Sequence, residues 1–153
     1  MGGSQFVAPD EEEYAYQIGK MIALEGWVLL NGGKASGVMN ASARGARENG
    51  GITVGILPAD NDSFVSSYID IPIITGMGLA RNVINILSSD IVIALPGRAG
   101  TISEIALALN HGKQVILFRF EVGSWIKYYI DENRVFITNE VEQVRQLLKE
   151  KLY

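Results

Sequence analysis

A glycine-containing turn followed by a carboxylate is the clearest chemical feature of this chain. The run Pro96-Gly97-Arg98-Ala99-Gly100-Thr101 joins the apolar stretch 91–94 to a stretch with helical spacing that contains Glu104. Backbone N–H groups at the start of a helix, together with the helix dipole, form a site for an anion, most often a phosphate. Ligands of parallel α/β sheets bind at the carboxyl ends of the strands, so Glu104 is expected to contact the same ligand. The turn therefore predicts a site for a phosphorylated small molecule.

Two further glycine loops lie between a predicted strand and a predicted helix. They are Asn31-Gly32-Gly33-Lys34-Ala35-Ser36-Gly37 and Gly76-Met77-Gly78-Leu79-Ala80-Arg81. Glycine allows positive φ and lets the backbone approach a ligand closely. Arg81 falls near the first turn of its helix, where its side chain could face the cleft. All three loops are predicted to meet at one edge of the sheet.

Each of these features also has a purely structural interpretation. The spacing Thr101-x-x-Glu104 fits a capping box, in which the two side chains satisfy N–H groups at the helix start. The first loop could be a plain connection, and Arg81 could be an exposed arginine or part of an ion pair. The sequence leaves these alternatives open.

The chain alternates strands with helices, which predicts a doubly wound parallel α/β sheet covered on both faces. The strands are expected at 27–30, 52–57, 71–75, 91–94, 114–118 and 134–137. The helices are expected at 14–22, 38–48, 79–87, 102–110, 122–130 and 140–151. A length of 153 residues predicts a single domain over 1–153.

Composition excludes several classes of function. The net charge is −4 and no cluster of Lys and Arg exceeds two, so a nucleic-acid partner is not expected. The chain has no Cys, and its Asp, Glu and His show no metal-ligand spacing, so no metal site is expected. No apolar run is long enough to span a membrane and no signal peptide is present, which predicts a cytoplasmic protein. Two helical stretches, 83–87 and 105–109, are apolar nearly all round and favour a homo-oligomer.

Four motifs, in this order along the chain, resemble those of the LOG superfamily, whose members were often labelled possible lysine decarboxylases. Within the superfamily, the chain is most similar to the branch that contains the molybdenum cofactor carrier proteins. The resemblance covers roughly the first 120 residues. It implies a Rossmann-like fold, assembly into dimers or tetramers, and a phosphate-bearing ligand held at the proline-glycine loop. The motifs are Asn31-Gly32-Gly33…Gly37-Val38-Met39, Gly50-Gly51-Ile52-Thr53-Val54-Gly55-Ile56-Leu57-Pro58, Gly76-Met77-Gly78-Leu79-Ala80-Arg81-Asn82 and Pro96-Gly97-Arg98-Ala99-Gly100-Thr101-Ile102-Ser103-Glu104.

The resemblance implies two alternative functions. One is a binding protein for a phosphate-bearing nucleotide or pterin-type cofactor, such as the molybdenum cofactor, with no further cofactor required. The other is a nucleoside 5′-monophosphate phosphoribohydrolase in which Glu104 and Arg81 are catalytic. Lysine decarboxylation is not supported, because no lysine lies in a recognisable pyridoxal phosphate setting. The residues expected to bind the ligand are Gly3, Ser4, Asn31, Gly32, Gly33, Gly37, Met39, Gly78, Pro96, Gly97, Arg98, Ala99, Gly100 and Thr101.

Two departures from the family pattern bear on the site. Arg98 replaces the usual second glycine, and its side chain could crowd a phosphate or contact it. Relatives also begin with an apolar strand before Gly-Gly-Ser, whereas this chain starts at Met1-Gly2-Gly3-Ser4. Either the chain start is misassigned or another segment compensates for the strand.

Overall fold

The computed structural model describes residues 1–6 and 9–152. Its strands are β1 (Leu29–Asn31), β2 (Thr53–Leu57), β3 (Ile71–Ile74), β4 (Ile91–Ala94), β5 (Gln114–Phe118) and β6 (Val135–Thr138). Its α-helices are α1 (Glu11–Leu24), α2 (Gly37–Glu48), α3 (Arg81–Leu87), α4 (Ala99–Asn110), α5 (Lys127–Asp131) and α6 (Val141–Leu152). Two 3₁₀ turns, Gly78–Ala80 and Ser124–Ile126, precede α3 and α5.

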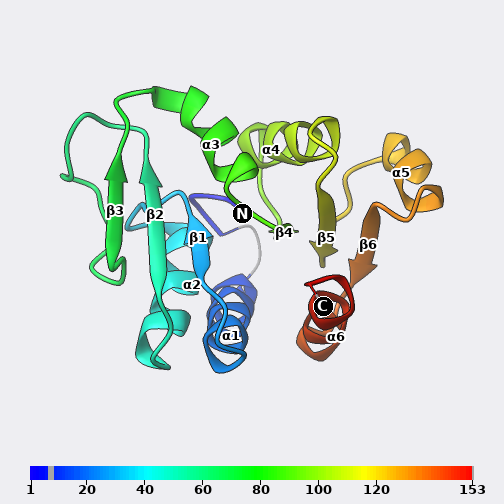
Figure 1. Cartoon of the computed structure of the whole chain (residues 1–153), viewed down its shortest axis with the longest axis horizontal. Coiled ribbons are helices and arrows are strands. Elements are labelled where there is room, and N and C mark those ends of the chain that lie inside the picture. The colour runs from blue at the N-terminus through cyan, green and yellow to red at the C-terminus, as the bar shows by residue number, and fades with distance from the viewer. Residues whose placement is uncertain (7–8, 153) are drawn as a thin grey trace.

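The strands form two three-stranded parallel sheets, in the orders β1-β2-β3 and β4-β5-β6. The start of the chain lies between them (Figure 1). The amino group of Met1 donates to the carbonyl of Ile93 at 2.5 Å, and the Leu95 N–H donates to the Met1 carbonyl at 3.0 Å. The Gly3 N–H donates to the Pro96 carbonyl at 3.1 Å. Residues 1–3 therefore pair through backbone hydrogen bonds with the carboxyl end of β4 and the residues that follow it.

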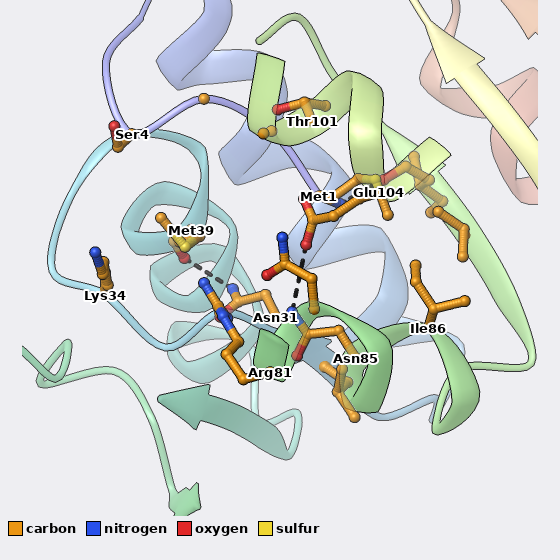
Figure 2. Close-up of a pocket in the computed structure, with 18 of the residues that line it drawn as sticks. Met1, Ser4, Asn31, Lys34, Met39, Arg81, Asn85, Ile86, Thr101 and Glu104 are labelled. Atoms are coloured by element: carbon orange, nitrogen blue, oxygen red, sulfur yellow. Dashed lines mark hydrogen bonds between the residues drawn. The ribbon is translucent and has the colours of Figure 1, made fainter. Parts of the chain in front are cut away.

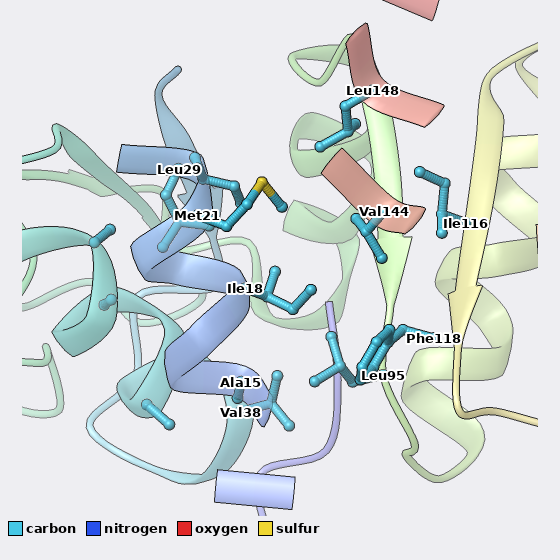
Figure 3. Close-up of a cluster of buried hydrophobic side chains, with 14 residues drawn as sticks. Ala15, Ile18, Met21, Leu29, Val38, Leu95, Ile116, Phe118, Val144 and Leu148 are labelled. Atoms are coloured by element: carbon cyan, nitrogen blue, oxygen red, sulfur yellow. The ribbon is translucent and has the colours of Figure 1, made fainter. Parts of the chain in front are cut away.

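Helices cover both faces, as expected for a Rossmann-like α/β domain. Alternation along β5 sends Ile116 and Phe118 into one core and Val115 and Leu117 into the other. The first core lies against α1, α2 and α6, and the second against α3 and α4. Figure 3 shows the side chains of α1 facing those of α6 in the first core.

The two cores thus fix the positions of the strand ends and of the helices that begin there.

The helix after the proline-glycine turn begins three residues earlier than the sequence predicts. Its first residue is Ala99, with Arg98 as the N-cap residue and no side-chain cap hydrogen bond. Thr101 therefore lies inside the first turn, and the capping-box interpretation is wrong. Glu104 lies one turn further along α4, and both side chains are buried.

Two other expectations change in detail. The stretch 122–130 forms the 3₁₀ turn Ser124–Ile126 followed by the short helix α5, not one helix. The stretch 105–109 is expected to need a partner subunit, but Ile105, Ala108 and Leu109 are buried within the monomer. Exposed apolar side chains instead gather on and near β3, where Ile71, Ile73 and Ile74 are all exposed.

Candidate functional site

A pocket of about 240 Å³ opens where β1 and β4 end and α3 and α4 begin. Figure 2 shows its labelled side chains converging from the N-terminal segment, the 31–39 region, α3 and α4. The pocket brings together residues of all three predicted loops. The expected site residues that line it are Gly3, Ser4, Asn31, Gly32, Met39, Arg81, Arg98, Gly100, Thr101 and Glu104.

Six expected site residues do not line this pocket. Gly33, at φ +71°, packs against the backbone of Gly55, and Gly37, at φ +54°, begins α2. Pro96 and Gly97 line a separate hollow on the far side of the turn. The remaining two are Gly78, which opens the 3₁₀ turn before α3, and Ala99, which opens α4.

Asn31 shapes the wall of the pocket with both ends of its carboxamide. Its Nδ2 donates to the Met39 carbonyl at 3.0 Å and to the Ser42 hydroxyl at 3.2 Å. Its Oδ1 accepts the Gly33 N–H at 2.8 Å. Since these bonds tie the end of β1 to α2, Asn31 holds the first loop in place.

Arg81 is a buried cation at one side of the pocket. Only 7% of it is exposed, and its Nη1 donates to the Ile56 carbonyl at 2.7 Å. Gly32 makes room for the guanidinium, because a Cβ on Gly32 would lie 2.5 Å from Nη2. Burial lowers the pKa of Arg81, and the charge of Glu104 opposes this shift. An arginine guanidinium stays protonated in proteins.

Glu104 faces the same pocket from the other side and is 8% exposed. Its Oε1 accepts the Asn85 Nδ2–H at 3.4 Å. Within the described part of the chain no ion pair joins Glu104 to Arg81, although both line the pocket (Figure 2). Two opposite buried charges that share a pocket without contact leave room between them for a polar ligand.

The pocket also has lining residues that were absent from the expected set. Lys34 adds a further cation to Arg81 and Arg98, and Asn82 and Asn85 add two buried carboxamides from α3. Asn82 closes the third family motif, and Asn85 follows three residues later on the same face of α3. Arg98, which replaces the usual family glycine, lines the pocket as well.

Within residues 1–6 and 9–152, no group of three or more His, Cys, Asp or Glu side chains is arranged to hold a metal ion. No helix in this part of the chain is long and apolar enough to cross a membrane.

Solved structures resemble the whole fold. The molybdenum cofactor binding protein of Rippkaea orientalis is 43% identical, with a TM-score of 0.90 over 100% of this chain and 94% of that one. The molybdenum cofactor carrier protein of Chlamydomonas reinhardtii is 36% identical, with a TM-score of 0.89 over 99% and 94%.

A more distant curated relative is an enzyme. The cytokinin riboside 5′-monophosphate phosphoribohydrolase of Mycobacterium tuberculosis is 37% identical over 65% of this chain. The chain spans 54% of that enzyme's length.

A family model described as the SLOG cluster4 family matches residues 1–148, nearly the whole length. That match runs from the N-terminal segment beside β4, through all three pocket loops, into α6. With the parallel strands, the turn before α4 and the neighbouring structures all in agreement, this chain belongs to the SLOG cluster4 family.

Proposed function

We propose that this protein binds a phosphate-bearing nucleotide or pterin-type cofactor in the pocket between β1 and β4 and acts as a carrier. The observation that carries the proposal is the cluster of Lys34, Arg81 and Arg98 around one pocket that also contains the start of α4. Free N–H groups in the first turn of a helix and nearby guanidinium groups both favour a phosphate. The neighbours described as molybdenum cofactor binding and carrier proteins support the same ligand class.

The proposed ligand enters with its phosphate toward the cations. Arg81 is held in a fixed position by its bond to the Ile56 carbonyl, so it offers its remaining N–H groups without first having to be ordered. Gly100 and Thr101 line the pocket at the start of α4, where their N–H groups have no partner inside the helix. A charged phosphate oxygen accepts hydrogen bonds from both kinds of donor.

A second function, nucleoside 5′-monophosphate phosphoribohydrolysis, is favoured by the buried carboxylate of Glu104 opposite Arg81. In that reaction the bond between the anomeric carbon and the base nitrogen breaks, and its electron pair leaves with the base. Water adds its oxygen to the anomeric carbon and its proton goes to the base. Glu104 would orient that water or stabilise positive charge at the carbon, as carboxylates do in glycoside hydrolysis.

We further propose that the protein is a homo-oligomer. Ile71, Ile73 and Ile74 of β3 are 49%, 43% and 49% exposed, and Leu79 in the following turn is 82% exposed. An exposed apolar edge strand readily pairs with another chain unless it is covered. A second copy of this protein would cover it.

Incubation with a panel of nucleoside 5′-monophosphates separates the carrier from the hydrolase. We expect the nucleotides to raise the melting temperature, with no free base detected by chromatography. Base release that disappears in Glu104→Ala but persists in Glu150→Ala, a matched change at an exposed glutamate of α6, would establish the hydrolase instead. If no nucleotide binds and none releases free base, both functions are refuted for nucleotides.

A further inference from the structure

Phe64 presents an aromatic ring to solvent from a segment whose backbone is held in place. The residue is 70% exposed. The Ala35 N–H donates to the Phe64 carbonyl at 2.9 Å, and the Ser66 N–H donates to the Gly33 carbonyl at 2.8 Å. The Ser66 hydroxyl also donates to Oδ1 of Asn40 at 2.7 Å. Because these bonds tie the segment to the first glycine loop and to α2, the ring can meet a ligand without the cost of ordering a loop.

The ring of Phe64 borders a hollow of about 280 Å³ at the carboxyl end of β2. The residues that line this hollow are Lys34, Leu57, Pro58, Ala59, Asn61 and Phe64. Lys34 lines the pocket as well, so the two spaces adjoin at this residue. Figure 2 shows Lys34 at the edge of the pocket, across from Glu104. The hollow therefore extends the pocket on the side away from the carboxylate.

The sizes of the two spaces indicate that one ligand occupies both. The pocket alone has a volume of about 240 Å³. Sites for small molecules usually enclose about 300–1,000 Å³, so this pocket is small for a whole nucleotide. The hollow supplies the missing space, and Lys34 at the boundary offers an ammonium group to a phosphate that lies between them.

The polar groups around the hollow already have hydrogen-bond partners. The backbone carbonyls of Leu57, Pro58 and Ala59 accept N–H groups from the segment 75–78. The carboxamide of Asn61 is bonded to its neighbours in the same loop. With these groups engaged, the walls of the hollow suit the flat face of a ring better than a hydrogen-bonding edge.

We infer that the hollow holds the heterocycle of the ligand, stacked on Phe64, while the phosphate lies against the cations of the pocket. Stacking on an aromatic side chain tolerates different bases, because every base has a π-face. The hollow then selects a ring by its area and not by the groups on its edge. The inference rests on the carrier function proposed above, since a hydrolase needs the bond to the base beside Glu104.

Titration calorimetry on the full chain tests this inference with GMP and ribose 5-phosphate, which carries a phosphate on the same sugar without a heterocycle. Phe64→Leu keeps an apolar side chain but removes the ring. We expect it to weaken GMP binding about tenfold and to leave the affinity for ribose 5-phosphate unchanged. Tyr128→Leu, which removes an exposed aromatic ring on α5, is the matched control and should change neither affinity.

The other outcomes of this titration separate the inference from the proposed function. Full GMP affinity in a folded Phe64→Leu protein would overturn the inference and leave the proposed function intact. If this variant also lowers the molar mass in light scattering, Phe64 belongs to a contact between copies of the chain instead. An equal loss of affinity for both compounds would overturn the inference too, because Phe64 would then act on the loop and not on the ring. No binding of GMP to the unsubstituted protein would count against both.

Phe64→Trp tests the contact directly, because a nucleobase stacked on an indole quenches its fluorescence. We expect GMP to quench this variant more strongly than the unsubstituted protein, whose Trp27 and Trp125 line neither space. Ribose 5-phosphate should quench neither. Equal quenching of the two proteins at saturating GMP would contradict stacking on this residue.

A comparison of bases tests selection by ring area. GMP and AMP should bind with similar affinity, and both should bind more tightly than UMP, whose single ring covers less of Phe64. Equal affinity for UMP, or a strong preference for one of the two purines, would overturn selection by area.

Discussion

Replacing Gly45 with alanine should destabilise the protein by about 2 kcal/mol, although the same change stabilises most helices. Gly45 of α2 and Gly19 of α1 lie where the two helices cross. A Cβ on Gly45 would overlap the Tyr16 carbonyl oxygen and lie 2.8 Å from its carbon and 3.0 Å from the Lys20 nitrogen. A Cβ on Gly19 would meet the backbone of Ser42 in the same way.

The magnitude follows from what must move. Each obstacle is backbone inside a helix, so no side chain can turn aside and the helices must separate. Overpacking of this kind costs about 3 kcal/mol, the upper part of its usual range. Alanine recovers about 1 kcal/mol of helix propensity, which leaves a net loss of about 2 kcal/mol. For a domain of this length the melting temperature should fall by about 4–8 °C.

Gly100→Ala is the matched control, because Gly100 is also a helical glycine but a Cβ there would meet nothing within 4 Å. It should stabilise the protein by about 0.5 kcal/mol, because alanine lowers the conformational entropy of the unfolded chain. Thermal and urea unfolding of ligand-free protein, followed by circular dichroism, measure both variants. An unfolding midpoint of Gly45→Ala equal to or above that of the unsubstituted protein would refute the reasoning. So would an equal loss of stability in Gly100→Ala.

Three further predictions concern α6, the site and the surface. Lys149 lowers the pKa of Glu25 below its ordinary value of 4.5. The stability that this carboxylate contributes is therefore present above pH 4.5 and is lost as the pH falls below it. Glu25→Gln should lower the melting temperature at pH 7, and the melting temperatures of the variant and the unsubstituted protein should converge in acid. Gly32→Ala should push the Arg81 guanidinium from its place and weaken binding of a nucleotide about tenfold in a titration, with folding retained. Ile73→Lys on β3 should lower the molar mass measured by light scattering; an unchanged oligomer would place its interface elsewhere.

The central strands were predictable from sequence because their side chains are buried on both faces of the sheet. An apolar run predicts β4 at Ile91–Ala94, and β5 at Gln114–Phe118 is apolar after its first residue; both predictions match the observed bounds. The start of α4 was not predictable from sequence, because Gly100 is typical of a loop and yet lies within the first turn of the helix. The pairing of residues 1–3 with β4 uses backbone groups alone, which no side-chain pattern reveals.

The composition of the site was partly predictable for a related reason. Glycines and charged residues at strand ends are visible as a pattern, and Arg81 and Glu104 do line one pocket. Asn82 lies in the third family motif, whereas Asn85 lies outside every motif and resembles an ordinary polar interruption of a buried helix face. The structure shows that both side chains are buried and that both residues line the pocket.

The carrier and hydrolase functions place different demands on Glu104, and this makes them separable. In a carrier, the carboxylate, which accepts a hydrogen bond from Asn85, would help hold the ligand. In a hydrolase, it must act at the anomeric carbon, between the phosphate and the base. Glu104→Gln keeps the shape of the side chain but removes its charge. It should weaken nucleotide binding in a carrier, whereas in a hydrolase it should abolish base release and leave the dissociation constant nearly unchanged. Loss of release together with loss of affinity would mean that Glu104 positions the ligand and that its role in turnover is indirect.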